Sequence, residues 1–134
     1  EYTGTRLEKV FDPELPLTQL DLFLIGQAFS NVVKNALEAM DGGGSLRVQT
    51  RKLRIRHGPE PRLEFAEVLF EDSGPGIDPD DVGKVVRPFY SRKEGGLGLG
   101  LPLVHHIVRA HGGAFQVGNR PEEGARVRIY LPIR

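Results

Sequence analysis

The sequence contains no cysteine and no tryptophan, a single methionine, and no excess of charge of either sign. Without cysteine the chain can form no disulfide and no thiolate, and a zinc site loses its commonest ligand. Its 18 basic and 18 acidic side chains balance, which argues against a nucleic-acid binder that relies on bulk electrostatics. No apolar run approaches the roughly 18 residues of a membrane span, and no signal-peptide pattern opens the chain.

The length of the chain, 134 residues, predicts one domain spanning 1–134 that is large enough to bury a core. The first residue is Glu1 and the one methionine is Met40, so we expect a piece of a longer protein. Glycine is abundant, at 17 residues, and several of these glycines fall in short clusters.

The hydrophobic pattern predicts a strand over 5–11 and then a helix. Thr18 with Asp21 resembles a capping box, and the helix after it runs to about Met40, where glycines end it. The residues expected to face the core from this helix share a helical spacing: Leu22, Ile25, Phe29, Val32, Val33, Ala36 and Met40.

Two strand-like runs, 45–56 and 62–72, predict an antiparallel hairpin. The alternation of the first run changes parity between Val48 and Leu53, so we expect a bulge or a break there. Residues 73–100 have no sustained period and are too long for a plain connection, which is typical of a functional or disordered loop.

The last third of the chain predicts a helix over 102–111 and a hairpin with strands over 114–117 and 125–131. The apolar residues that this helix is expected to bury are Leu103, Val104, Ile107 and Val108. The whole order of elements predicts an α+β fold, a two-layer α/β sandwich with the helices packed on one face of a mixed, mostly antiparallel sheet.

A polar stripe on the first helix has an unusual composition. Gln27, Asn31, Asn35 and Glu38 fall within an arc of roughly 80°, away from the apolar stripe. Solvated helix faces favour Glu, Lys and Arg, whereas Asn is a poor interior helix former, costing about 0.5–0.7 kcal/mol each. Two asparagines four residues apart can instead offer amide oxygens, which are neutral hard ligands suited to Mg²⁺. From these residues alone, a solvated face and a metal-binding face stay equally open.

Asp72 ends the second buried strand and opens the sequence Asp-Ser-Gly-Pro-Gly-Ile. A carboxylate at the end of a strand can accept a hydrogen bond from an exocyclic amine, and the glycines let a flat ring approach the backbone. In isolation, an Asp-x-Gly-x-Gly sequence is more often an ordinary Asx turn.

Residues 95–101 read Gly-Gly-Leu-Gly-Leu-Gly-Leu and lead straight into the second predicted helix. Glycines before a helix N-terminus form an anion site, because free N–H groups and the helix dipole point at the ligand. Neither of the two commonest phosphate signatures is present. Arg92 and Lys93, just before the glycines, can reach phosphate oxygens or are simply a solvated pair.

In this order and at this spacing, four segments resemble the N, G1, F and G2 boxes of sensor histidine kinases. They are the Asn-x-x-x-Asn-Ala of the first helix, the Asp-x-Gly-x-Gly, the Phe89-Tyr90 loop and the Gly-x-Gly-Leu-Gly-Leu. The resemblance covers nearly the whole chain and is to the catalytic, ATP-binding domain (the Bergerat or GHKL fold) of the superfamily shared with gyrase, Hsp90 and MutL. Residues 36–40 and 111–113 are most similar to its nitrogen-regulation (NtrB/NtrY-like) branch.

The resemblance implies that Asn35 carries the Mg²⁺ that bridges the phosphates of ATP, with Asn31 assisting one turn earlier. Together with Lys93, these asparagines are the implied catalytic residues. The residues that it assigns to the phosphates and their surroundings are Arg92, Lys93, Gly96, Leu97, Gly98, Leu99, Gly100 and Leu101.

The resemblance also implies that Asp72 accepts a hydrogen bond from the adenine amino group. Gly74 and Gly76 would shape that pocket and Ile77 would flank it. Residues 78–96 would form a mobile ATP lid.

One position bears on the reaction. In ATP-hydrolysing relatives the residue four before the metal asparagine is Glu, which activates water, whereas Asn31 cannot take a proton. A site without this base fits transfer of the γ-phosphoryl group to a histidine better than hydrolysis. That histidine would lie on an upstream dimerisation domain, whose motif this sequence lacks. The histidines present are expected to be structural or at the surface: His57, His105, His106 and His111.

Three positions depart from the family pattern: Leu97 and Ala125 replace threonines, and Arg87 replaces an acidic residue. Leu97 removes a hydroxyl contact to phosphate. It therefore favours a first alternative, a nucleotide-binding but catalytically degenerate interaction module. A second alternative is an ATPase clamp like gyrase or Hsp90, against which Asn31 argues.

The implied partners are ATP or ADP, the upstream histidine-containing domain and a response regulator, with no nucleic acid and no direct membrane contact by this domain. A basic run over 47–56 invites a nucleic-acid interpretation, but glutamates at 60–71 lie beside it without interleaved aromatics. We expect a cytoplasmic domain that is monomeric as given, with a homodimeric full-length protein.

Overall fold

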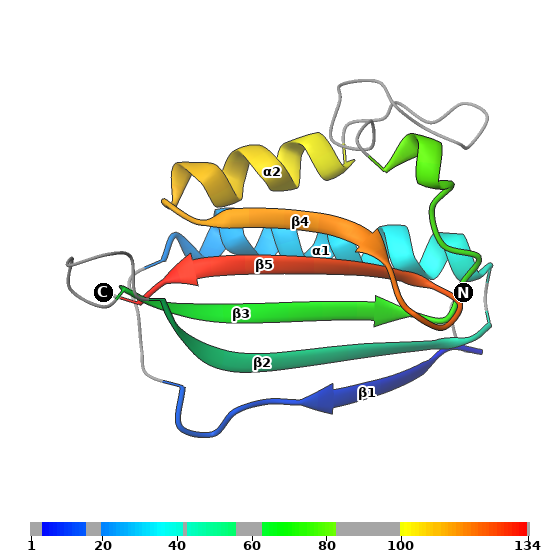
Figure 1. Cartoon of the computed structure of the whole chain (residues 1–134), viewed down its shortest axis with the longest axis horizontal. Helices are drawn as coiled ribbons and strands as arrows, with labels where there is room; N and C mark the ends of the chain where they lie inside the picture. Colours follow the sequence, from blue (N-terminus) through cyan, green and yellow to red (C-terminus); the bar gives the residue numbers. More distant parts are fainter. Residues whose placement is uncertain (1–3, 16–19, 42, 56–62, 83–99, 134) are drawn as a thin grey trace.

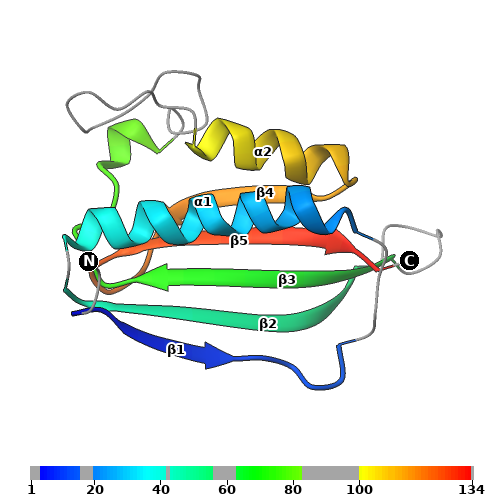
Figure 2. The same cartoon turned by 180° about the vertical axis from the view of Figure 1, so that it is seen from behind.

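The computed structural model describes residues 4–15, 20–41, 43–55, 63–82 and 100–133. They form two layers, in which two helices cover one face of a five-stranded sheet (Figure 1, Figure 2). The predicted α+β sandwich is therefore confirmed, with one short 3-10 helix in addition. In this described part, no helix is both long enough and apolar enough to span a membrane.

The strands of the sheet are β1 (Arg6–Val10), β2 (Ser45–Ile55), β3 (Leu63–Asp72), β4 (Ala114–Asn119) and β5 (Ala125–Pro132). They lie in the order β1-β2-β3-β5-β4. β1 pairs parallel with β2, and every other pair is antiparallel. The sheet is thus mixed and mostly antiparallel, as predicted.

The register between β2 and β3 is continuous over all their paired residues, so the predicted bulge between Val48 and Leu53 is wrong. In an unbroken strand, two residues at odd separation lie on opposite faces. Val48 packs against the core beneath the helices, whereas Leu53 lies on the helix-free face opposite Phe65. The parity change in the sequence therefore marks the point where the apolar residues of β2 move from the helix-covered face of the sheet to the helix-free face.

Helix α1 (Leu22–Met40) begins after Asp21, whose side chain accepts the Leu24 N–H at 3.1 Å. The observed N-cap is thus Asp21, while the predicted cap Thr18 lies outside the described residues. The helix ends at Asp41, which has a positive φ of 50°.

Helix α2 (Gly100–Ala110) begins two residues earlier than predicted. Its last turn is tied to the first turn of α1 through His111, whose Nδ1 donates to the Ile107 carbonyl at 2.9 Å and whose Nε2 accepts the Asp21 N–H at 3.1 Å. The predicted structural role of His111 is confirmed. Because this link joins the start of α1 to the end of α2, the C-terminal half of α1 lies beside the start of α2.

The core lies between the helices and the covered face of the sheet. Its buried cluster consists of Ile25, Ala28, Val32, Val68, Phe70, Val104, Ile107, Val108, Ile129 and Leu131. Two residues predicted to face the core do not: Leu22 is 82% exposed and Leu103 is 41% exposed. Leu22 is the first residue of α1, and Leu103 lies about 100° around α2 from Val104, turned away from the sheet.

Candidate functional site

Three carboxamide side chains, Gln27, Asn31 and Asn35, follow one another at four-residue spacing along α1. Asn31 and Asn35 are half-buried, and no described residue forms a hydrogen bond with any of the three side chains. Asn35 faces the first residue of α2, where a β-carbon at Gly100 would lie 3.2 Å from Asn35 Nδ2. Glycine at position 100 therefore leaves space beside the Asn35 carboxamide.

Asp72, the last residue of β3, is only 6% exposed. Its Oδ1 accepts two backbone hydrogen bonds, from Gly74 at 2.9 Å and from Ala125 at 3.1 Å. Its Oδ2 receives no hydrogen bond from the described residues. Since Oδ1 already accepts two hydrogen bonds and Oδ2 is not among the fully buried atoms of the described residues, Oδ2 is the atom available to an N–H group of a ligand.

The loop after Asp72 is fixed to the end of β4. The Ile77 N–H donates to Asn119 Oδ1 at 2.8 Å, and Asn119 Nδ2 donates to the Ile77 carbonyl at 2.7 Å. Gly76 has a φ of +81°, and a β-carbon there would lie 2.8 Å from Asn119 Oδ1. Only glycine fits this backbone position without a shift.

The Asp72 loop and the carboxamide stripe meet at the C-terminal end of α1. A β-carbon at Gly74 would lie 3.6 Å from the Ala39 carbonyl oxygen and 3.3 Å from Met40 Cγ. Ala39 follows Asn35 by about one helical turn, roughly 5.4 Å along the axis. The end of β3, the second half of α1 and the start of α2 accordingly lie at one end of the molecule (Figure 1). The structure thus brings Asn35 and Asp72 to the same region rather than to opposite surfaces.

Most of the predicted phosphate-binding segment lies outside the described residues, together with most of the predicted lid over 78–96. The site residues concerned are Arg92, Lys93, Gly96, Leu97, Gly98 and Leu99. Gly100 and Leu101 are described, and they are the first two residues of α2. The N-terminus of α2 therefore follows the glycines directly, which is the arrangement that an anion site at a helix N-terminus requires.

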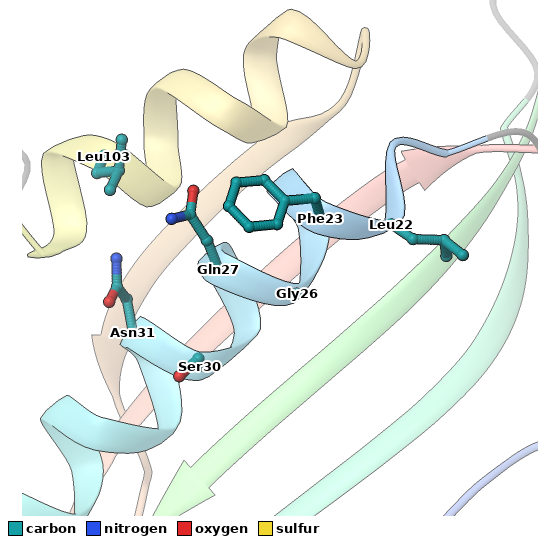
Figure 3. A pocket seen from close by; sticks show the side chains of 7 residues that line it. All are labelled: Leu22, Phe23, Gly26, Gln27, Ser30, Asn31 and Leu103. Carbon is teal, nitrogen blue, oxygen red and sulfur yellow. The ribbon is translucent and has the colours of Figure 1, made fainter.

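An open groove runs along the first turns of α1 on the side of α2 (Figure 3). Its lining residues are Leu22, Phe23, Gly26, Gln27, Ser30, Asn31 and Leu103. Phe23 is 73% exposed and lies beside Gln27, while the carboxamides of Gln27 and Asn31 point toward α2 (Figure 3). An apolar surface therefore adjoins Asn31, and no sequence pattern singled out Phe23.

Three ionisable side chains with shifted pKa values, Arg51, Glu67 and Tyr130, lie on the helix-free face of the sheet. Glu67 is 2% exposed there and forms an ion pair with Arg51, with Nε and Oε1 2.6 Å apart. Burial alone would raise the pKa of Glu67, but the hydrogen bond and charge of Arg51, helped by Tyr130 and Arg128, outweigh burial and lower it. The same pairing raises the pKa of Arg51.

The described basic residues of β2 form ion pairs with glutamates of the two neighbouring strands, β1 and β3. The ion pairs are Arg47–Glu8, Arg51–Glu67, Lys52–Glu64 and Arg54–Glu64. Pairing of this kind neutralises the strand locally. It supports the prediction that these arginines belong to an ordinary charged hairpin.

The turn between β4 and β5 also adjoins Asp72, although no sequence pattern indicated it as part of the site. Besides Asn119 and Ala125, this turn contributes Arg120, whose Nη1 donates to the Asp72 carbonyl at 2.9 Å. A β-carbon at Gly124 would overlap the same carbonyl oxygen. Asn and Gly are common turn residues, so no local signal marked them. Their role follows from the pairing of β5 with both β3 and β4.

Comparison with known proteins places the chain in a family. Residues 21–134 match the model described as "Histidine kinase-, DNA gyrase B-, and HSP90-like ATPase". The chain is 39% identical over 128 residues to the sensory histidine kinase/phosphatase NtrB of Rhodobacter capsulatus, covering 92% of this chain and 36% of that protein. It is 37% identical to NtrB of Salmonella typhimurium, covering 98% of this chain and 38% of that protein. The chain thus spans little more than a third of the length of these relatives.

Solved structures agree with this placement. The mycobacterial sensor histidine kinase MprB is similar with a TM-score of 0.78 at 30% identity, covering 99% of this chain and 85% of that chain. The nucleotide-free catalytic domain of histidine kinase ThkA is similar with a TM-score of 0.79 at 26% identity, covering 96% and 80%. The resemblance drawn from the sequence motifs, including the NtrB-like branch, is confirmed. The chain belongs to the histidine kinase-, DNA gyrase B- and HSP90-like ATPase family, as the catalytic domain of a sensor histidine kinase.

Proposed function

We propose that residues 1–134 act as one catalytic domain that binds Mg-ATP and transfers its γ-phosphoryl group to a histidine on a separate domain. One observation carries this proposal. A carboxylate oxygen of Asp72 and the carboxamides of Asn31 and Asn35 have no hydrogen-bonding partner among the described residues, and Gly74 packed on α1 connects their elements. These atoms are complementary to the two ends of an adenine nucleotide.

At the adenine end, Asp72 Oδ2 accepts from the exocyclic amine, and the backbone of Gly74 and Gly76 lets the flat ring approach. Ile77 supplies an apolar contact beside the ring. The two hydrogen bonds to Asp72 Oδ1 support this assignment, because they orient the carboxylate before any ligand arrives.

At the phosphate end, the donor set fits Mg²⁺. The described residues contain no group of three His, Asp or Glu side chains that could hold a metal by themselves. Mg²⁺ commonly takes one or two protein oxygens and leaves the remaining positions to water and phosphate. The carboxamide of Asn35, with Asn31 one turn away, is therefore the protein's ligand. When bound, the metal ion neutralises charge on the phosphate oxygens.

Most of the remaining phosphate contacts are assigned to residues beyond the described ranges. Arg92 and Lys93 neutralise the terminal phosphates, and the glycine-rich segment 96–101 wraps them at the N-terminus of α2. Residues 78–96 act as the lid. Gly100 supports this arrangement, since its missing side chain leaves Asn35 accessible from α2.

Transfer, rather than hydrolysis, is favoured by Asn31. A carboxamide cannot take a proton from water, so the site lacks a general base at that position. The lone pair of an acceptor imidazole forms the new N–P bond while the bond from the γ-phosphorus to the bridging oxygen breaks and ADP leaves. Positioning and charge neutralisation supply the catalysis.

The acceptor domain docks in the groove of Figure 3. Its apolar lining by Leu22, Phe23 and Leu103 is exposed, and Asn31 at its end adjoins the phosphate side of the site. A helix with an apolar face carrying the acceptor histidine fits both features, because its apolar side chains would cover Phe23 while the imidazole reaches past Asn31.

The rest of the signalling system is proposed by analogy with the family. The relatives are two to three times longer than this chain, which leaves room for an acceptor domain outside it. Further transfer to a response regulator, a cytoplasmic site of action, a monomeric chain and a homodimeric full-length protein belong to this proposal.

Titration of the chain with ATP and ADP, with and without Mg²⁺, followed by transfer to a supplied histidine-bearing domain of a close relative, tests the proposal. We expect Mg-dependent ATP binding and an acid-labile, base-stable phosphorylated acceptor. Binding without transfer to any acceptor would instead support a degenerate interaction module, which Leu97 favours. Steady hydrolysis by the chain alone, abolished by Asn31→Ala, would support an ATPase clamp.

A further inference from the structure

The side chain of Asn119 occupies an unusual position for an exposed residue. It is the last residue of β4, and its carboxamide forms two hydrogen bonds with the backbone of Ile77, 42 residues away. The amide oxygen accepts at 2.8 Å and the amide nitrogen donates at 2.7 Å. One side chain thus satisfies both polar backbone groups of Ile77, as a neighbouring strand would do.

The chain around this contact is shaped to admit it. Gly76 adopts a φ of +81°, and a β-carbon there would lie 2.8 Å from Asn119 Oδ1. A residue with a side chain at position 76 would therefore both strain the backbone and push the amide away. The close approach of Asn119 and the glycine at 76 require each other.

The same turn also holds Asp72. Ala125 N–H donates to Asp72 Oδ1 at 3.1 Å and Arg120 Nη1 donates to the Asp72 carbonyl at 2.9 Å. Arg120 N–H closes the turn by donating to the Gly124 carbonyl at 2.9 Å. Asn119 begins this turn, so it fixes the far end of the Asp72–Ile77 loop to the element that orients the carboxylate.

We infer that Asn119 is a positioning residue that sets selectivity for the adenine amino group. This inference rests on the proposed function, because it takes Asp72 Oδ2 as the acceptor for that amine. Asn119 touches neither the amine nor the phosphates. It holds Gly76 and Ile77 at the spacing at which a purine ring lying against this loop presents its amine to Asp72.

The location of Asn119 separates this role from a structural one. The residue is exposed and outside the buried core, so its loss removes little packing. What it does remove is the attachment of the loop, which then samples several spacings. Loss of the Asn119 side chain therefore reduces discrimination between bases more than it reduces the stability of the fold.

The test measures discrimination with two nucleotides that differ at the amine. Inosine triphosphate carries a carbonyl oxygen where ATP carries the amino group, so it cannot donate to Asp72 Oδ2. We expect Asn119→Ala to weaken ATP about three- to tenfold, with inosine triphosphate changed less than twofold. The dissociation constant of inosine triphosphate divided by that of ATP then falls by nearly the same factor as the loss of ATP affinity. The melting temperature stays close to that of the unchanged protein.

Gln116→Ala is the matched control. Gln116 is another exposed carboxamide of β4, and its hydrogen bond from the Tyr130 hydroxyl lies on the helix-free face. We expect this change to leave both dissociation constants unaltered. An equal loss of ATP and inosine triphosphate in Asn119→Ala, or no loss of either, overturns the inference.

A double-mutant cycle adds a second criterion. If Asn119 acts through Asp72, then Asn119→Ala combined with Asp72→Asn costs no more ATP affinity than Asp72→Asn alone. Additive losses overturn the inference. Failure of the underlying function looks different, since the unchanged protein would then bind ATP and inosine triphosphate equally or bind neither.

Discussion

The two ends of the candidate site are built differently. At the Asp72 end, the carboxylate and the following loop are fixed by hydrogen bonds from the β4–β5 turn, through Ala125 and Asn119. At the carboxamide end, Asn31 and Asn35 stand on a rigid helix, but their amide groups have no partner among the described residues. The Asp72 end is thus organised within the described structure, whereas in the proposed function the carboxamide end is completed by the ligand.

Because of this difference, we expect the Asp72 end to determine nucleotide affinity and selectivity, and the carboxamide end to determine the rate of phosphoryl transfer. A preorganised acceptor at Asp72 gives selectivity without the entropy loss of ordering a loop. In the proposed function, the carboxamides contact the metal and the phosphates, so they act where charge moves during transfer. Substitutions at the two ends are therefore expected to affect different measured quantities.

The largest expected effect is at the carboxamide end. Asn35→Ala removes the proposed Mg²⁺ ligand and should reduce Mg-dependent transfer at least about a hundredfold, while metal-free adenosine binding changes less than threefold. Phosphotransfer assays and metal-free calorimetry measure the two quantities. Autophosphorylation that survives in the intact kinase would show that Asn35 is not the metal ligand.

Asp72→Asn should act at the other end. It replaces an oxygen acceptor partly by a donor without changing the shape of the side chain, so ATP should bind at least tenfold more weakly. Isothermal titration calorimetry measures this loss, with inosine triphosphate as the matched control ligand that gains rather than loses. Unchanged ATP affinity would remove Asp72 from the site.

Asn31→Glu sharpens the distinction between transfer and hydrolysis. It introduces a carboxylate that can accept a proton from water, so steady ATP hydrolysis by the chain should rise about tenfold or more. Phosphate release is the measurement, and Asn31→Gln, which adds length without a base, is the control. Equal rates in both variants would mean that the identity of this residue does not decide the reaction.

Glu67→Gln, far from both ends, should give the smallest change in nucleotide binding, within twofold. It should still lower the free energy of unfolding at pH 7 by about 1–3 kcal/mol, since Arg51 loses its charged partner. Urea titration measures this change. A drop in ATP affinity here would show that losses at either end of the site partly reflect global stability.

The lowered pKa of Glu67 fixes the sign of a pH effect in the same experiment. The ionised carboxylate stabilises the fold at pH values above its unfolded-state pKa of about 4.3. This stabilisation is lost as the pH falls through the lower folded-state pKa. The free energy of unfolding should therefore fall less steeply with acid in Glu67→Gln than in the unchanged protein.

Much of the fold could be predicted from periodicity. The helix over α1, the hairpins and their order follow from apolar spacing and glycine breaks, which are local properties of the chain. The predictions that were wrong concern which face of a strand or helix is covered by the rest of the molecule. The parity change at Leu53 suggested a bulge, whereas the strand is regular. Leu53 and its cross-strand partner Phe65 both lie on the helix-free face. Leu22 fits the apolar spacing but is 82% exposed at the start of α1.

The candidate site likewise contains residues that the sequence indicated and residues that only the structure reveals. Asn31, Asn35 and Asp72 were identified because their residue types and spacing form motifs. Asn119 and Ala125 were missed because their contacts depend on β5 lying between β3 and β4, and a backbone N–H donor leaves no trace in the sequence. Sequence patterns name the groups that meet a ligand more readily than the groups that hold them.

Strand β1 has a practical consequence for the size of the domain. It occupies one edge of the sheet and pairs with residues 45–49 of β2, yet the family match starts only at residue 21. A version trimmed to that boundary would make the 11-residue β2 an edge strand with unpaired backbone groups facing solvent. Such edge strands pair with strands of other molecules. Aggregation of a shortened protein would then reflect where it was cut rather than poor folding, and retaining 6–10 should prevent it.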